Sequence, residues 1–263
     1  MKVYFVIPAF NEAENIPALL HNLQQTTQRL NLDYQVILVD DGSSDGTASV
    51  ARAYGGQAVS VLEHAHNQGP GAAFRNGFRA ALKLCTEDDL IVSLEADNTS
   101  DLSILPAMLS LSQQRYEVVL ASVYSPGGGI IGTSWQRKVL SWGANQLLAG
   151  VLGTRHIHTY SSFFRVYRPT LLMSALHAYG DRLICEPGFV CMVELLMKLH
   201  LLGARFAEVP MILDGNLRLG TSKMKIWRTI SGYGRVIWYY CRGDYQSSTV
   251  SVELPTIPTT LRN

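Results

Sequence analysis

Residues 90–101 read LIVSLEADNTSD and join a short apolar run to two carboxylates one residue apart. The run has the near-continuous hydrophobicity of a strand buried on both faces. Glu95 and Asp97 follow it directly, and ligands of open α/β sheets bind beyond the carboxyl ends of the strands. Two carboxylates there predict a binding site for a hard divalent cation, with substrate phosphates as further ligands. A solvated acidic turn is the alternative reading of the triplet taken alone.

The segments around this stretch alternate between strand and helix patterns. Apolar runs predict strands at 3–7, 34–39, 58–62, 90–94 and 116–121. Helical spacing predicts helices between them, at 13–30, about 45–54, 69–82 and 102–111. This alternation indicates an α/β fold with a mostly parallel, Rossmann-like sheet flanked by helices. The first strand-to-helix turn contains no glycine, so the G-x-G-x-x-G fingerprint of a dinucleotide-binding domain is missing.

The second half has a different character. Helical spacing predicts helices at 135–152 and 188–202, and apolar runs predict strands at 163–167 and 206–212. Pro210 indicates that the latter strand lies at an edge or ends there. The segment 223–242 is basic and rich in aromatic residues, which is typical of an amphipathic helix in a membrane interface. A helix packed on its own domain is the alternative, since two glycines interrupt the segment.

The composition excludes some classes of partner. The chain has 263 residues and a net charge of +1, so nothing indicates nucleic-acid binding. Charged residues make up 16% of the chain, below the usual quarter or so, and hydrophobic residues make up 47%. That balance favours contact with a partner surface or a membrane. Met1 leads straight into a strand, and no apolar stretch reaches the roughly 18 residues of a membrane span. We therefore expect a cytoplasmic protein that is peripheral to the membrane.

Three motifs at strand ends carry a family resemblance. They are residues 7–12 (IPAFNE), 39–47 (VDDGSSDGT) and 95–97 (EAD), in this order along the chain and each at the end of a strand. Together they resemble family 2 inverting glycosyltransferases with the GT-A fold. Further motifs in the second half, at 124–129, 164–168, 208–210 and 220–223, look like those of polyprenyl-phosphate (dolichol-phosphate) mannose synthases. The resemblance covers about residues 2–230.

The resemblance implies a site for a nucleotide-sugar such as GDP-mannose or a UDP-hexose. Glu95 and Asp97 would hold Mg²⁺ or Mn²⁺ against the diphosphate, and Lys223 would reach it from a closing loop. Arg137 and Arg165 would grip the acceptor phosphate, forming the catalytic group together with Asp97. The full set of residues implied to bind the nucleotide-sugar is Pro8, Phe10, Glu12, Val39, Asp41, Leu94, Glu95, Ala96, Asp97, Arg218 and Lys223.

The implied reaction is a single in-line displacement with inversion. A hexose, mannose or glucose, would pass from the nucleotide diphosphate to a polyprenyl or dolichyl phosphate. A phosphate acceptor is ionised at neutral pH, so no strong general base is needed, and the metal would stabilise the leaving diphosphate. There are two alternative hypotheses. The protein is a family 2 glycosyltransferase with a non-lipid acceptor, or it is a catalytically silent nucleotide-sugar-binding protein.

Several positions depart from the pattern of the mannose synthases. Glu95 stands where they have aspartate, Val123 where they have arginine, and Thr159 where they have aspartate. These departures concern the donor phosphates and the acceptor rather than the scaffold. Glu194, on the helix at 188–202, is interpreted as a buried acid paired with a nearby cation.

The resulting domain assignment has three parts. Residues 1–222 form the glycosyltransferase domain, with a nucleotide-sugar-binding half at 1–121 and an acceptor half at 122–222. Residues 223–242 form the amphipathic helix. The tail at 243–263 is rich in serine, threonine and proline, and we expect it to be disordered.

Overall fold

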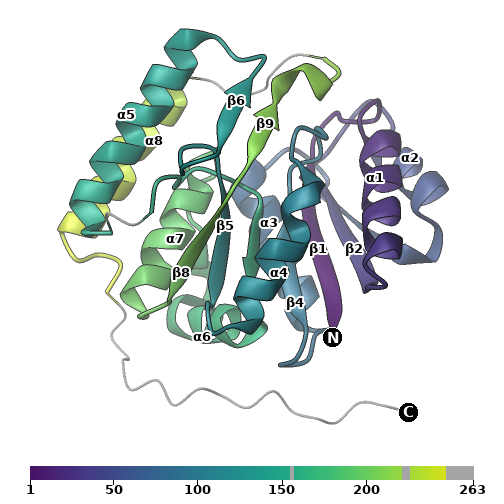
Figure 1. Cartoon of the computed structure of the whole chain (residues 1–263), viewed down its shortest axis with the longest axis horizontal. Coiled ribbons are helices and arrows are strands. Elements are labelled where there is room, and N and C mark those ends of the chain that lie inside the picture. Colours follow the sequence, from purple (N-terminus) through teal and green to yellow (C-terminus); the bar gives the residue numbers. More distant parts are fainter. Residues whose placement is uncertain (155–156, 221–225, 247–263) are drawn as a thin grey trace.

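A seven-stranded sheet forms the centre of the computed structural model, which describes residues 1–154, 157–220 and 226–246 (Figure 1). The strands of this sheet are β1 (Lys2–Ala9), β2 (Asp33–Asp40), β3 (Val59–Glu63), β4 (Leu90–Ser93), β5 (Val118–Ser122), β7 (Arg165–Tyr167) and β8 (Phe206–Pro210). Their order is β3-β2-β1-β4-β7-β5-β8. Every neighbouring pair is parallel except the two that β7 makes, with β4 and with β5. The predicted, mostly parallel α/β sheet is therefore confirmed.

Helices cover both faces of this sheet. They are α1 (Ile16–Arg29), α2 (Thr47–Gly55), α3 (Pro70–Leu82), α4 (Leu105–Gln113), α5 (Trp135–Leu152), α6 (Pro169–Tyr179), α7 (Cys191–Leu201) and α8 (Ile226–Cys241). One apolar core lies under α3, α6 and α7, and the other lies under α1, α2 and α4. Along β1, Tyr4 and Val6 enter the first core, while Val3, Phe5 and Ile7 enter the second. Burial on both faces explains why the strands read as uninterrupted apolar runs.

A second, two-stranded sheet lies beyond the carboxyl ends of β5 and β8 (Figure 1). It consists of β6 (Gly129–Ile131) and β9 (Ile212–Asp214), which pair in parallel. The sequence predicted one strand at 206–212. The structure instead ends β8 at Pro210, on the edge of the main sheet, and starts β9 at Ile212. The break agrees with the prediction that Pro210 lies at an edge or an end, because proline cannot donate to a strand ladder.

The observed helices differ from the predicted ones mainly at their ends. The helix predicted at 135–152 is confirmed over its full length as α5. The helix predicted at 188–202 begins three residues later, at Cys191. Helix α6 was not predicted. Asparagine is a common helix cap, but the side-chain oxygen of Asn11, just before α1, accepts from the Ser44 amide at 2.9 Å. Asn15 occupies the cap position without a side-chain cap bond.

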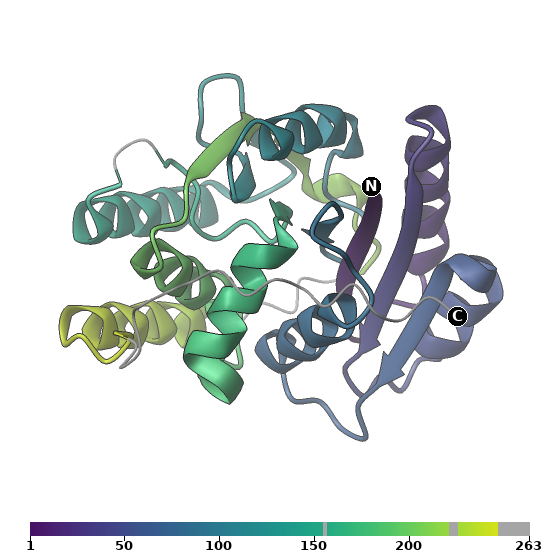
Figure 2. The same cartoon turned by 90° about the horizontal axis from the view of Figure 1, so that it is seen from below.

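Helices α5 and α8 contact one another and lie side by side at one end of the molecule (Figures 1 and 2). Helix α8 accounts for most of the segment predicted at 223–242. Of the tail predicted to be disordered at 243–263, residues 243–246 are described, with Tyr245 buried in a core, and the rest lies outside the described residues, as do 221–225. Among the described residues, no helix has the length and hydrophobicity needed to cross a membrane.

Candidate active site

A cavity of about 840 Å³ opens at the carboxyl ends of the central strands. Part of its wall comes from the end of β1 and the loop that follows, with Pro8, Phe10 and Glu12. The triplet after β4 contributes Glu95, Ala96 and Asp97 to the same cavity. Strand order places β1 beside β4, so parallel pairing brings the two chain segments to one edge. The predicted motif residues therefore meet in one hollow.

Asp97 is almost completely buried and has partners on both carboxylate oxygens. Its Oδ1 accepts from the backbone amide of Thr99 at 3.1 Å and from the hydroxyl of that residue at 2.7 Å. Its Oδ2 accepts from the Nε of Arg218 at 2.7 Å, and the Nη2 of Arg218 also donates to it. The guanidinium of Arg218 thus acts as the counterion of a buried carboxylate.

The charges of Asp97 and Arg218 also act on Glu95. Burial, followed by the negative charge of Asp97, raises the pKa of Glu95 to about 8, and Glu12 acts in the same direction. Arg218 acts in the opposite direction. An acid whose pKa is raised in this way ionises most readily when a further cation arrives.

The two acids fit a divalent cation. They are carboxylates one residue apart in a partly enclosed cavity, and oxygen ligands are those that Mg²⁺ and Mn²⁺ prefer. In the part of the chain that the structure describes, no three potential metal-binding side chains gather. The protein would therefore supply two ligands, and a bound diphosphate and water would supply the rest.

A loop between β9 and α8 reaches the cavity and carries Arg218. Asn15 holds this loop: its side-chain amide donates to the carbonyl of Leu219 at 3.1 Å, and its oxygen accepts from the Leu219 amide at 2.9 Å. The same side-chain nitrogen donates to the Glu12 carboxylate at 2.6 Å. Asn15 was not predicted, since its partner is 204 residues away. Lys223 was predicted to reach the diphosphate from the same region, and it lies outside the described residues.

Asp41 lines the cavity, but its carboxylate is engaged by the protein. It accepts from the amides of Gln68 at 2.9 Å and Gly69 at 2.7 Å, and it contacts the Nδ1 of His64 at 2.7 Å. The loop at 67–69 therefore owes its position to Asp41. Val39 and Leu94 have side chains wholly buried in the two cores. Because the Val39 side chain is buried in a core, only the backbone of this residue is available for contact with a nucleotide base.

Another part of the cavity wall comes from α8 and the segment at 186–190. Arg235 forms a two-bond ion pair with Glu186, both bonds being 2.8 Å. Gly232 allows the helix to approach closely, because a Cβ at that position would come within 2.9 Å of Val190. The sequence did not mark Glu186 as a site residue, since no motif surrounds it.

Comparison with known proteins identifies the family. Residues 4–175 match the family model described as Glycosyl transferase family 2. The chain is a family 2 glycosyltransferase. The match begins in β1 and ends in α6, so it includes the acid triplet and the ends of β1 and β2.

Two relatives of this glycosyltransferase are transferases for undecaprenyl phosphate. The undecaprenyl-phosphate mannosyltransferase of Micrococcus luteus is 30% identical over 226 residues, which are 85% of this chain and 88% of that protein. The undecaprenyl-phosphate 4-deoxy-4-formamido-L-arabinose transferase of Sodalis glossinidius is 32% identical over 182 residues, which are 68% of this chain and 52% of that protein.

Solved structures of other glycosyltransferases share the fold. The glucosyl-3-phosphoglycerate synthase of Mycobacterium tuberculosis, in complex with Mn²⁺, uridine diphosphate and phosphoglyceric acid, superposes with a TM-score of 0.63 at 20% identity. That match covers 95% of this chain and 81% of that one. The mannosyl-3-phosphoglycerate synthase of Rubrobacter xylanophilus gives 0.63 at 19% identity, over 98% and 79%. These likenesses establish the GT-A fold of the glycosyltransferase.

The two arginines predicted to grip the acceptor phosphate do not line the cavity. Arg137 is half-buried in the first turn of α5. Arg165 is completely buried, and its guanidinium donates to the carbonyls of Ser162, Met192 and Tyr160 at 2.7–2.8 Å. In the structure Arg165 fastens the loop before β7 to α7, and its assignment to the acceptor phosphate stays a prediction.

Glu194 of the glycosyltransferase has the structural role that the sequence favoured. It is wholly buried and pairs with Lys198 at 2.6 Å, one helical turn away in α7. Its other oxygen accepts from the amides of Cys185 and Glu186, at 2.8 and 2.7 Å. The buried charge is thus fully compensated, and Glu194 secures the segment that walls the cavity.

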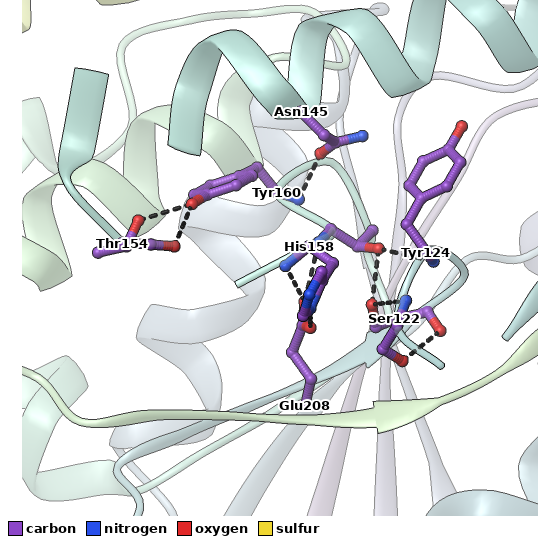
Figure 3. A network of polar contacts seen from close by, with 9 residues as sticks. Ser122, Tyr124, Asn145, Thr154, His158, Tyr160 and Glu208 are labelled. Atoms are coloured by element: carbon purple, nitrogen blue, oxygen red, sulfur yellow. Dashed lines mark hydrogen bonds and ion pairs between the residues drawn. The ribbon is translucent and has the colours of Figure 1, made fainter. Parts of the chain in front are cut away.

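Thr159, one of the departures from the mannose-synthase pattern, bonds to Ser122, Tyr124 and Glu208, which are labelled in the polar network of Figure 3. Its hydroxyl bonds that of Ser122 at 2.8 Å and accepts from the Tyr124 amide at 3.3 Å. Its amide and that of His158 donate to the Glu208 carboxylate at 2.8 and 2.9 Å. Thr159 thereby joins the loop after α5 to β5 and β8 without placing a charge there. Compared with the mannose-synthase pattern, Thr159 removes a negative charge and Val123 removes a positive charge.

Proposed function

We propose that this glycosyltransferase moves a hexose, mannose or glucose, from a nucleotide diphosphate to a polyprenyl phosphate at the cytoplasmic face of a membrane. The observation that carries the proposal is the pair Glu95 and Asp97, which faces a cavity at the strand ends beside Arg218. Both relatives described above are named for transfer to undecaprenyl phosphate, which supports the same class of acceptor.

The donor side is the half at 1–121. Pro8, Phe10 and Glu12 would border the base and ribose, since all three line the cavity beside the acid triplet. Asp41 would act on the nucleotide mainly through the loop at 67–69 that it holds in place. Structures of glucosyl-3-phosphoglycerate synthase contain Mn²⁺ and uridine diphosphate, which supports a nucleotide-diphosphate donor and a divalent cation.

The chemistry requires charge compensation above all. A divalent cation held by Glu95 and Asp97 would supply Lewis-acid stabilisation of the departing diphosphate. Arg218 would add a second positive charge, because its guanidinium already lies beside Asp97 in the cavity. The acceptor phosphate is an anion at neutral pH and attacks the anomeric carbon in line, so the site needs no general base. Lys223 would act on the same diphosphate.

A transfer assay with separated phases tests this function. Purified protein, Mn²⁺ and a short-chain polyprenyl phosphate are incubated in turn with labelled GDP-mannose, UDP-glucose and UDP-N-acetylglucosamine. We expect one donor to transfer label into the organic phase and to require the cation. If label were transferred only to a water-soluble acceptor added in place of the lipid, the acceptor would be a soluble molecule and not a polyprenyl phosphate. Donor binding without transfer to either acceptor would identify a catalytically silent nucleotide-sugar-binding protein.

A further inference from the structure

All four tryptophans of the chain lie on α5 and α8. Each is more than half exposed: Trp135 by 71%, Trp142 by 53%, Trp227 by 82% and Trp238 by 60%. Tryptophan is usually well buried in a protein that meets only water. This concentration of exposed tryptophan on two helices indicates a surface that meets something other than water.

The exposed residues follow the helical repeat. On α8, Trp227, Ile230 and Trp238 are separated by three and eight residues and lie within one stripe, since successive residues turn by 100°. The other side of α8 is packed, with Gly232 and Val236 buried. Helix α8 is therefore apolar on two sides, one against the protein and one toward solvent.

Helix α5 repeats this arrangement beside it. Trp135, Val139 and Trp142 are spaced by four and three residues and are all more than half exposed, whereas Leu148 and Leu152 of the same helix are buried. Because α5 and α8 contact one another, their exposed residues belong to one end of the molecule (Figures 1 and 2). We call this set the docking face: Trp135, Val139, Leu140, Trp142, Leu147, Trp227, Ile230 and Trp238.

The charge on these helices has one sign. Neither 135–152 nor 226–241 contains an aspartate or a glutamate. The two helices carry four cations, which are Arg137, Lys138, Arg228 and Arg235, and Glu186 outside the helices neutralises the last of them. Tryptophan side chains favour the polar–apolar boundary of a bilayer, and neighbouring cations favour anionic headgroups. The chemistry of the face therefore matches an anionic lipid surface.

Helix α8 also connects this face to the cavity. Arg228, Thr229, Ser231 and Arg235 line the cavity from α8. The two arginines are seven residues apart, on the side of the helix between its packed and exposed stripes. Any surface that covers the exposed stripe of α8 would therefore lie next to the cavity wall.

We propose that the docking face on α5 and α8 inserts into the interface of an anionic bilayer and sets the cavity beside the lipid headgroups. Docking would bring a membrane-held phosphate acceptor to the side of the cavity that α8 walls, without extraction of the lipid into water. The proposal rests on the proposed function only for the identity of that acceptor, because the docking itself requires no catalysis.

Tryptophan fluorescence tests the proposal directly, since the docking face contains every tryptophan of the chain. The full-length protein is mixed with phosphatidylcholine vesicles, with and without phosphatidylglycerol, and emission and acrylamide quenching are recorded. We expect a blue shift, protection from acrylamide and co-sedimentation, all stronger with phosphatidylglycerol. Emission that stays unchanged while the protein stays in the supernatant would overturn the proposal.

Matched variants assign the binding to the face. In Trp142→Ala/Trp238→Ala we expect vesicle affinity to fall by about tenfold or more, because two apolar anchors are lost. Tyr54→Ala is the control: Tyr54 is 67% exposed on α2, outside the docking face, and its removal should leave affinity unchanged. Equal losses in the two variants would contradict the assignment. Concentration-dependent dimers in light scattering that the double variant abolishes would assign the face to a second copy instead.

A soluble substrate separates this proposal from the proposed function. With a short prenyl phosphate free in buffer, the double variant should transfer sugar as fast as the wild type. If the wild type binds vesicles but transfers no sugar to any acceptor, the proposed function fails and docking stands. If transfer proceeds but vesicles are ignored, docking fails and the function stands.

Discussion

The cavity edge and the docking face depart from a normal protein surface in opposite ways. At the cavity edge, charged groups are buried: Asp97 and Asp41 are almost inaccessible, and each has several hydrogen-bond donors. At the docking face, large apolar side chains such as Trp227 are exposed and their neighbours are cations. Both arrangements cost free energy in water, since buried charge and exposed apolar surface are each unfavourable.

The comparison shows how the two regions differ in what stabilises them. The charges at the cavity edge are compensated within the protein, by Arg218, Thr99 and the loop at 67–69. The tryptophans of the docking face are mostly exposed, and the described contact over Trp238, with the Arg242 guanidinium 5.8 Å from the ring centroid, covers only part of one of them. An external surface would have to cover the rest. Substitutions at the cavity edge should therefore change catalysis and folding, whereas those at the docking face should change membrane binding alone.

The largest effect is expected at Asp97. In Asp97→Asn, transfer activity should fall by about a thousandfold, because the site loses a metal ligand and leaves Arg218 without its counterion. Donor affinity, measured by calorimetry, should no longer depend on Mn²⁺. Asp101→Asn is the control: Asp101 caps a short 3₁₀ turn, accepts from the Ser103 amide and does not line the cavity. Retained metal dependence in Asp97→Asn would refute the metal assignment.

Arg165→Met tests a buried charge that lies outside the cavity. Loss of its bonds to three backbone carbonyls should lower the free energy of unfolding by about 3 kcal/mol, because each carbonyl loses a charged donor in a buried place. Chemical denaturation measures this change, and KM for the acceptor measures any role in binding. A stable variant with a greatly raised acceptor KM would support the assignment of Arg165 to the acceptor phosphate.

Arg218→Gln should strengthen the binding of Mn²⁺ alone and weaken the binding of the nucleotide diphosphate. Without the guanidinium, the Oδ2 of Asp97 is released, so Mn²⁺ binding without nucleotide should tighten by about tenfold. Binding of the nucleotide diphosphate with Mn²⁺ should weaken, since a cation is lost from the cavity. Electron paramagnetic resonance of Mn²⁺ measures the first effect and calorimetry the second. Arg235→Gln removes an equal charge from the same cavity, and an equal gain in Mn²⁺ affinity there would show a general charge effect.

The smallest effect on folding is expected at the docking face. Trp238→Ala should change the free energy of unfolding by less than about 0.5 kcal/mol, because the side chain is mostly in water in the isolated protein. Denaturant titration in the absence of vesicles gives this value. A loss of several kcal/mol would mean that Trp238 belongs to the folded core and not to a docking face.

Some features of the fold and the site could be predicted from local patterns. The alternation of apolar runs and helical spacing indicated the parallel sheet, because buried strands and amphipathic helices leave different periods in a sequence. The triplet at 95–97 indicated a ligand site, since carboxylates at the end of such a strand have a predictable place. The pairing of Glu194 also followed, because a lone acid in an apolar helix needs a counterion.

The remaining features depended on tertiary contacts. Asn15 and Leu219 meet although 204 residues separate them, and no local pattern encodes that pair. The burial of Arg165 depends on how the loop before β7 packs against α7, which a sequence motif does not show. The sequence left open whether the tryptophans at 227 and 238 are exposed or packed, since an apolar helix reads the same whether its outer stripe meets a core or solvent. The sequence by itself thus determined the periodicity of the elements and the chemistry of the strand ends. Only the tertiary structure decided which side chains are covered, because burial depends on contacts between segments that are distant along the chain.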